Sequence, residues 1–117
     1  MTDQELGIYG EGLAQRHLLK EGYSIRQTNY RYKKYEIDIV AEKADKIVVV
    51  EVKTRQTAEI GEPWMAVTKK KQRQIIQCAN DYVQSRNISK EVRFDIISIV
   101  HNSYRSKLEH IVDAFST

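Results

Sequence analysis

Two apolar segments rich in β-branched residues, 37–41 and 47–50, are separated only by a short stretch that includes Lys43-Ala44-Asp45-Lys46. Short β-branched segments joined by a polar turn are typical of a β-hairpin. A turn centred between Ala44 and Asp45 places Asp38 opposite Glu51. It also places Val40 opposite Val49 and Glu36 opposite Lys53. Residues directly opposite each other on one face have Cβ atoms about 5 Å apart. The hairpin therefore predicts two neighbouring carboxylates on one face of a sheet, while its other face is apolar: Ile37, Ile39, Ala41, Val48, Val50 and Val52.

The rest of the chain predicts an α/β fold with the element order α-β-β-β-α-β-β. A capping box at Thr2 and Glu5 begins a first helix, and Gly22 ends it. The predicted strands cover residues 23–30, 35–42, 46–55, 92–101 and 108–112. A second helix begins at Pro63 or Thr68 and ends near Arg86, with an apolar stripe made of Trp64, Val67, Ile75, Cys78, Ala79 and Tyr82. Because a helix connects the third strand to the fourth, we expect these two strands to be parallel neighbours in a mixed central sheet flanked by helices.

Length and composition limit the classes of protein to which the chain can belong. Its 117 residues contain no linker or repeat and are expected to form one domain, residues 1–117. No apolar segment has the length of a membrane span, and the N-terminus lacks the pattern of a signal peptide. A single cysteine excludes an internal disulfide. We therefore expect a cytoplasmic protein with no membrane partner, and its net charge of +3 is weakly in favour of a polyanionic partner.

The predicted neighbours Asp38 and Glu51 are the first candidates for a functional site. Like charges in direct opposition destabilise a sheet unless something lies between them. Carboxylate oxygens suit Mg²⁺ or Mn²⁺, and Lys53 follows Glu51 on the same face, where its ammonium group can orient a water molecule or a phosphate. The alternative is that these charged residues only mark the solvated ends of two strands.

Two further charged residues lie near apolar positions of the predicted helices. Lys71 is in the middle of the apolar stripe of the second helix, whereas Lys69 and Lys70 point away from it. Lys71 is therefore either a structural ion-pair partner or a group that binds phosphate. Glu11 lies at the edge of the buried stripe of the first helix, and its periodicity alone indicates an ordinary surface glutamate.

These residues belong to a larger set of short motifs that follow one another through nearly the whole chain. The set includes Gly7-x-x-Gly10-Glu11, Asn29-x-Arg31, Glu36-Ile37-Asp38-Ile39-Val40-Ala41, Val50-Glu51-Val52-Lys53-Thr54-Arg55, Gly61-x-Pro63, Val67-x-x-x-Lys71 and Arg93-Phe94-Asp95-Ile96-Ile97, with His110 near the end. The set resembles the YraN-like family of small, largely uncharacterised bacterial proteins. That family is placed in the PD-(D/E)xK, or restriction-endonuclease-like, nuclease superfamily and is often compared with archaeal Holliday-junction resolvases. The chain departs from the family at Tyr35, where a glycine is usual.

The resemblance implies a restriction-endonuclease-like core and a role for each matching residue. Asp38, Glu51 and the carbonyl of Val52 would bind Mg²⁺ or Mn²⁺, and Lys53 would be the catalytic lysine. Glu11 would be an additional acidic residue from the first helix, and Lys71 an accessory group on the phosphate side. The implied activity is metal-dependent endonucleolytic hydrolysis of phosphodiester bonds in DNA, with branched or distorted DNA as a candidate substrate. Resolvase-like relatives also imply a homodimer.

The segment between the first two strands is the candidate nucleic-acid interface. Residues 29–35 interleave three cations, Arg31, Lys33 and Lys34, with three tyrosines. This composition suits phosphates and stacking on unpaired bases, or it belongs to a solvated turn. Arg55, just past Lys53, is a further candidate for a phosphate contact.

Two other functions stay open at this stage. One is a nucleic-acid-binding protein that keeps a nuclease-like fold with little or no catalysis, and the other is a scaffold whose acidic cluster holds a structural ion. The histidines His17, His101 and His110 are too scattered to predict a zinc site, and His17 and Cys78 are expected to be core residues.

Overall fold

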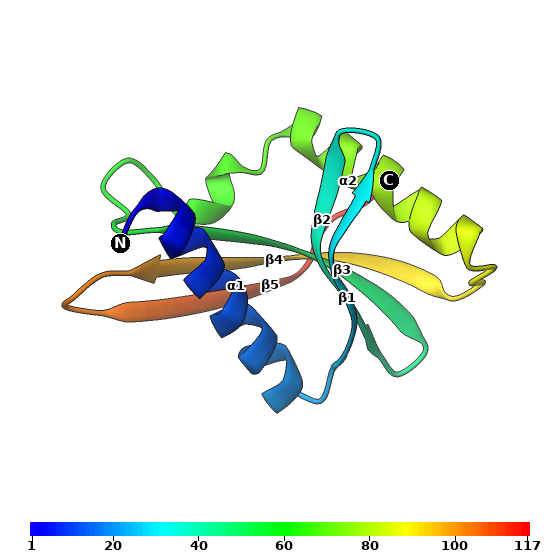
Figure 1. The fold of residues 1–117 in the computed structure, drawn as a ribbon, viewed down its shortest axis with the longest axis horizontal. Coiled ribbons are helices and arrows are strands. Elements are labelled where there is room, and N and C mark those ends of the chain that lie inside the picture. Colours follow the sequence, from blue (N-terminus) through cyan, green and yellow to red (C-terminus); the bar gives the residue numbers. More distant parts are fainter.

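The computed structural model describes residues 1–117 and contains a five-stranded sheet, two α-helices and one short 3₁₀ helix (Figure 1). In chain order the elements are α1 (Asp3–Lys20), β1 (Ser24–Tyr32), β2 (Tyr35–Lys43), β3 (Lys46–Arg55), η1 (Pro63–Ala66), α2 (Lys69–Ser85), β4 (Glu91–His101) and β5 (Ser106–Phe115). The predicted α-β-β-β-α-β-β order is confirmed. β5 is longer at both ends than its predicted range, 108–112.

The sheet is mixed, as predicted, with the strand order β1-β2-β3-β4-β5. Neighbouring strands are antiparallel except β3 and β4, which are parallel because α2 connects them. Figure 1 shows α1 crossing the sheet and the β1–β2 hairpin rising beside α2. Neither helix is both long enough and apolar enough to span a membrane.

The sheet has an apolar cluster on each face, one under each helix. The cluster under α1 contains Ile39, Ala41, Val48 and Val50, the residues predicted for one apolar face of the hairpin, and Val52 packs against its edge. The cluster under α2 contains Val40 and Val49 from the opposite face of the same strands. Ile37 was assigned to the first face and that prediction is wrong, because Ile37 packs in the cluster under α2. The alternation of faces is interrupted at Asp38, where the pairing of β2 with β3 ends.

The second helix begins later than Pro63, the earlier of its two predicted starts. The side chain of Thr68 accepts a hydrogen bond from the Lys71 backbone amide, which makes Thr68 the N-cap of α2. Pro63–Ala66 form the separate helix η1, held by its own short-range hydrogen bonds. Trp64 therefore lies outside the apolar stripe of α2, and 37% of its surface is exposed.

The first helix is held close to β3 by a glycine. The capping box at Thr2 and Glu5 is present, as predicted. A Cβ atom at Gly10 would lie 1.9 Å from the Thr54 hydroxyl, so only glycine fits here without a shift of the helix. This close approach brings the first half of α1 against the end of β3 that carries Thr54.

Candidate functional site

The β2–β3 hairpin has the predicted register, with Ile39 opposite Val50 and Val40 opposite Val49. The ladder ends at the first of these pairs, so Asp38 and Glu51 are the next residues on the two strands. Beyond this point the Val52 backbone amide of β3 donates its hydrogen bond to a side chain of β2 instead of to its backbone. The acceptor is Asp38 Oδ2, at 2.8 Å. The two carboxylates predicted to be neighbours therefore lie where the strands separate.

The predicted pairing of Glu36 with Lys53 is wrong. Past Ile39, β2 continues to pair with β1 but no longer with β3, and Glu36 lies opposite Arg31. The two side chains form an ion pair, with Arg31 Nε 3.1 Å from Glu36 Oε2. The side chain of Glu36 therefore contacts β1 within the β1–β2 hairpin and not Lys53 on β3.

Glu51 is the charged residue at the centre of the site. Only 3% of its surface is exposed, although it lies at the same edge of the sheet as several cations. The ammonium groups of Lys53 and Lys71 lie 3.9 Å and 3.6 Å from Glu51 Oε2. Lys71, which the sequence placed in the apolar stripe of the second helix, thus points toward Glu51 from the first turn of α2.

The electrostatics of the site disfavour a second negative charge. Burial, the charge of Glu51 and a hydrogen bond shared with that carboxyl group raise the pKa of Asp38 to about 8. The Val52 amide and Lys53 act in the opposite direction but are weaker. At neutral pH, Asp38 therefore tends to keep its proton unless a cation is added to the site.

Glu11, on α1, lies near the pair formed by Asp38 and Glu51. Its Oε1 accepts a hydrogen bond of 3.1 Å from the side-chain amide of Asn29 on β1. Burial and then the charge of Asp38 raise the pKa of Glu11, while the Asn29 hydrogen bond lowers it. Glu11, which periodicity alone assigned to the surface, is thus electrostatically coupled to Asp38.

The oxygen donors of this cluster fit a small divalent cation. Mg²⁺ typically takes one or two protein carboxylates and keeps several waters, and Asp38 and Glu51 supply two hard oxygen donors. The raised pKa of Asp38 has repulsion by Glu51 among its causes, and a cation between the two groups would relieve that repulsion. No three His, Cys, Asp or Glu side chains converge closely enough to enclose a metal by themselves.

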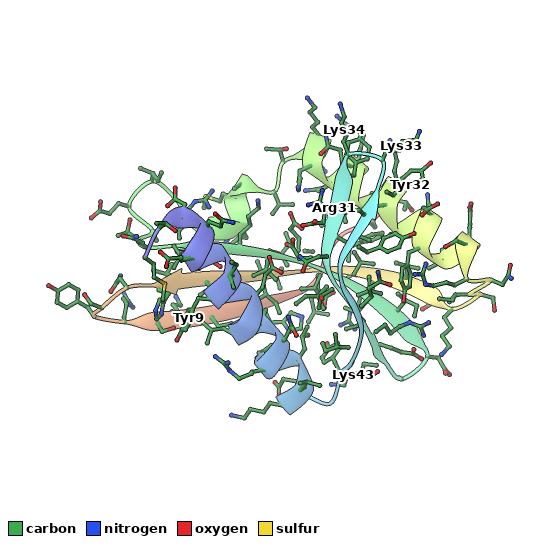
Figure 2. All side chains as sticks on the ribbon, in the orientation of Figure 1. Tyr9, Arg31, Tyr32, Lys33, Lys34 and Lys43 are labelled. Carbon is green, nitrogen blue, oxygen red and sulfur yellow. The ribbon has the colours of Figure 1, made fainter.

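The cations of the β1–β2 hairpin are exposed at its outer end. Figure 2 shows Lys33 and Lys34 pointing away from the sheet, with Arg31 lower on the same hairpin. The tyrosines differ from the prediction, because Tyr30, Tyr32 and Tyr35 are half-buried and pack against the core cluster under α2. The hairpin therefore offers charges for phosphates, while its aromatic rings mainly hold it against α2.

Arg55 lies at the end of β3 and is exposed. Its guanidinium group donates one hydrogen bond, to the Thr54 carbonyl. Most of its donors therefore face solvent on the same edge of the sheet as Lys53.

A second polar cluster, formed by Asp95, Arg93, His110, His17 and Tyr23, lies under α1. The buried Asp95 carboxylate accepts two hydrogen bonds from Arg93 and one from His110 Nε2 at 2.7 Å. His110 Nδ1 in turn lies 3.0 Å from His17 Nε2. The sequence did not predict this contact between His17 and His110, which forms because the fold brings α1 and β5 together.

Two residues of the site were not found by sequence reasoning. Asn29 was named only as part of the motif set; it has a positive φ of 52°, a conformation in which asparagine is enriched, and its side-chain amide donates a hydrogen bond to Glu11. Ser98 lies beside Lys53 on β4, and its hydroxyl accepts a hydrogen bond from the Trp64 backbone amide. A serine within an apolar strand was the available signal for the second residue.

Comparison with known sequences gives one consistent result. The uncharacterised protein family UPF0102 matches residues 10–99. A UPF0102 protein of Christiangramia forsetii is 45% identical over 111 residues, which cover 95% of this chain and 93% of the relative. A UPF0102 protein of Chlorobium phaeobacteroides is 45% identical over 117 residues, covering 94% and 92%, and one of Syntrophomonas wolfei is 41% identical over 114 residues, covering 97% and 99%. The chain therefore belongs to UPF0102, the YraN-like family.

Proposed function

We propose that this protein is a divalent-metal-dependent endonuclease with a restriction-endonuclease-like core that hydrolyses phosphodiester bonds in DNA. The observation that carries the proposal is the placement of Asp38 and Glu51 where β2 and β3 separate, with two lysine ammonium groups within 4 Å of Glu51. A buried carboxylate, Glu51, next to a carboxyl group with a raised pKa, Asp38, and beside cations is typical of a site that is completed by a ligand.

The residues would divide the chemistry among themselves. Asp38, Glu51 and the Val52 carbonyl would hold Mg²⁺ or Mn²⁺, which when bound supplies Lewis-acid stabilisation of charge on phosphate oxygens. Lys53 is placed to donate a hydrogen bond to the attacking water or to a phosphate oxygen as the P–O bond breaks. Lys71, whose ammonium group lies 3.6 Å from Glu51 Oε2, would neutralise the phosphate that enters the site.

The exposed cations would guide the substrate into this site. These cations are Lys33 and Lys34 at the tip of the β1–β2 hairpin, Arg31 on the same hairpin and Arg55 at the end of β3, all of them exposed and on the strands that carry Asp38 and Glu51 or next to them. Contacts of this kind position a nucleic-acid backbone without reading its sequence. Branched or distorted DNA is the candidate substrate that a resolvase-like core favours.

A nucleic-acid-binding protein without efficient catalysis is the second candidate. It is favoured by the ion pairs of Glu51 with Lys53 and Lys71, which show that the lysines can satisfy the carboxylate by themselves. In that case the same basic residues would bind nucleic acid, and the acidic cluster would be structural.

An assay of cleavage with and without Mn²⁺ distinguishes the two candidates. Branched, flayed and linear DNA are incubated with the wild-type protein, Glu51→Gln and Lys53→Ala. We expect metal-dependent products from the wild type and a loss of at least about 100-fold in rate in both variants, because each removes a group that touches metal or substrate.

Lys46→Ala is the matched control, since Lys46 lies at the opposite end of β3, and it should cut at the wild-type rate. Binding to all three DNAs without any product would reject the endonuclease and favour the second candidate. The absence of both binding and cleavage would reject both.

A further inference from the structure

Trp64 lies one strand away from the candidate catalytic lysine. The Trp64 backbone amide donates a hydrogen bond of 3.0 Å to the Ser98 hydroxyl. Ser98 is the partner of Lys53 in the parallel β3–β4 ladder, so the two side chains stand on the same face of the sheet. Neighbouring strands are about 4.8 Å apart, which places the start of η1 directly beside the acidic cluster.

The side chain of Trp64 borders an apolar hollow on the α2 side of the sheet. The hollow has a volume of about 390 Å³, and Met65, Ile96 and Ile111 contribute apolar surface to it. Trp64 and Met65 are 37% and 55% exposed, so this surface is not covered by the rest of the protein. Two polar groups stand at its border, Gln72 on α2 and Glu109 on β5.

The charges around the hollow are arranged unevenly. Lys53 and Lys71 lie on the side of the acidic cluster, and Lys69 and Lys70 are exposed in the same first turn of α2, which has no acidic residue. Gln72 is held by a hydrogen bond from its Nε2 to the Val67 carbonyl, so its amide is oriented at the border of the hollow. A ligand that is anionic on one side and flat and apolar on the other matches this arrangement.

A nucleotide has these properties, with a phosphate at one end and an aromatic base at the other. Bases stack on exposed aromatic side chains whatever their identity, and Gln and Glu can bond base edges. The tyrosines of the β1–β2 hairpin are packed against the core. Trp64 is thus the aromatic residue best placed to contact a base next to the phosphate that enters the site.

We propose that the hollow beside Trp64 receives one unpaired nucleobase adjacent to the phosphate bound at Asp38 and Glu51. The inference rests on the proposed function, since it assumes that nucleic acid is bound at the acidic cluster. A base that is paired within a duplex is not free to enter, so the site selects DNA with an extruded or unpaired base near the point of cleavage. The indole ring and the apolar floor bind the base, and Gln72 and Glu109 contact its edge.

Trp64 is the only tryptophan of the chain, which makes its fluorescence a direct probe of the hollow. In EDTA, where no metal-dependent cleavage takes place, the protein is titrated with a duplex containing one unpaired adenine and with the fully paired duplex of the same length. DNA anisotropy measures affinity, and tryptophan emission measures contact at the hollow. We expect the bulged duplex to bind about tenfold more tightly and to quench Trp64, whereas the paired duplex leaves its emission nearly unchanged.

Variants separate the hollow from other aromatic contacts. Trp64→Ala should bind both duplexes with the affinity of the paired one, and Trp64→Phe should keep part of the preference, because a phenyl ring still stacks. Tyr104→Ala is the control, because Tyr104 is 95% exposed at the turn between β4 and β5 and does not border the hollow. Circular dichroism of each variant verifies that the fold is retained.

The outcomes distinguish this inference from the proposed function. Equal binding of both duplexes without quenching would overturn the inference and leave the endonuclease proposal intact. A failure to bind either duplex in EDTA would also overturn the inference, and the Mn²⁺ cleavage assay then decides the endonuclease proposal separately. A change in tryptophan emission that depends on protein concentration, without DNA, would show that a second copy of the chain covers the hollow, and this would also overturn the inference.

Discussion

The protein contains two carboxylate clusters at its sheet, one under α1 and one where β2 and β3 separate, and they are built in opposite ways. Under α1, the Asp95 carboxylate is fully buried and accepts hydrogen bonds from Arg93, His110 and the Asp113 amide. At the separation of β2 and β3, Asp38 and Glu51 face each other with one backbone hydrogen bond to Asp38 and two long lysine contacts to Glu51.

The pKa values of the two aspartates show the same contrast. Burial raises the pKa of Asp95, but hydrogen bonds from His110 and Arg93 outweigh it and hold the pKa below its usual value. Burial and Glu51 raise the pKa of Asp38. A buried carboxylate whose hydrogen-bond partners are all present stabilises one packing arrangement. A carboxyl group that lacks such partners is instead suited to bind a ligand that supplies them. The first cluster is therefore structural and the second is the candidate site.

The largest predicted difference between the two clusters is in the free energy of unfolding after one carboxylate is removed from each. Asp95→Asn leaves the Arg93 guanidinium without its anion and should lower the free energy of unfolding by about 3 kcal/mol, toward the lower end for a broken buried ion pair because Arg93 keeps some solvent contact. In the absence of metal, Glu51→Gln should cost less than about 1 kcal/mol, because it also removes repulsion with Asp38. Urea denaturation in EDTA measures both values, and equal losses would contradict the contrast.

The second largest effect is expected in the pH dependence of the free energy of unfolding, to which Asp38 contributes. The folded protein keeps a proton on Asp38 up to a pKa of about 8, whereas the unfolded chain loses it near 3.8. The contribution of Asp38 to the free energy of unfolding is therefore fully present below the pKa of the unfolded chain, and it is lost as the pH rises through the pKa of the folded protein. The Asp38→Asn variant has no such proton to lose. In EDTA, its free energy of unfolding relative to that of the wild type should therefore rise by on the order of 2 kcal/mol between pH 5 and pH 8.

Thermal denaturation across this pH range is the measurement. Asp3→Asn is the matched control, because Asp3 is exposed at the start of α1 and should follow the wild-type curve. Parallel curves for Asp38→Asn and wild type would show that Asp38 is ionised at neutral pH, contrary to this account.

The smallest predicted effect separates two lysines in the first turn of α2, Lys69 and Lys71. Lys71 Nζ lies 3.6 Å from Glu51, whereas Lys69 is exposed in the same helical turn. Lys71→Ala should lower the rate of metal-dependent cleavage by about tenfold, and Lys69→Ala by less than about twofold. Steady-state cleavage rates at one salt concentration test this difference, and equal effects would remove Lys71 from the site.

Much of the fold was predictable because the signals were local. The capping box of α1, the register of the β2–β3 hairpin and the parallel neighbours β3 and β4 follow from spacing and connection rules, and all are present. Trp64 was assigned to the wrong element because its spacing continues that of α2, whereas the Thr68 cap begins the helix after it. Periodicity does not detect a cap that interrupts it.

The candidate site was predictable to the same extent. Asp38, Glu51 and Lys71 follow from strand pairing and helical periodicity, and the structure brings them together. Asn29 was not found as a contact of Glu11, because that contact depends on a single residue with positive φ and on the position of α1 against β1. The contact between His17 and His110 was missed for a similar reason, since it joins residues 93 positions apart.

The sequence by itself determined which strands pair, which faces are apolar and which charged residues lie within the apolar stripes, because these properties repeat with the periods of strand and helix. Only the tertiary structure decided which carboxylates are satisfied and which are not. The Asp95 cluster draws its partners from α1, β4 and β5, while β2 separates from β3 at Asp38 and leaves that carboxyl group with one backbone hydrogen bond. The satisfaction of a buried charge depends on groups that converge from distant parts of the chain, and no local pattern records that convergence.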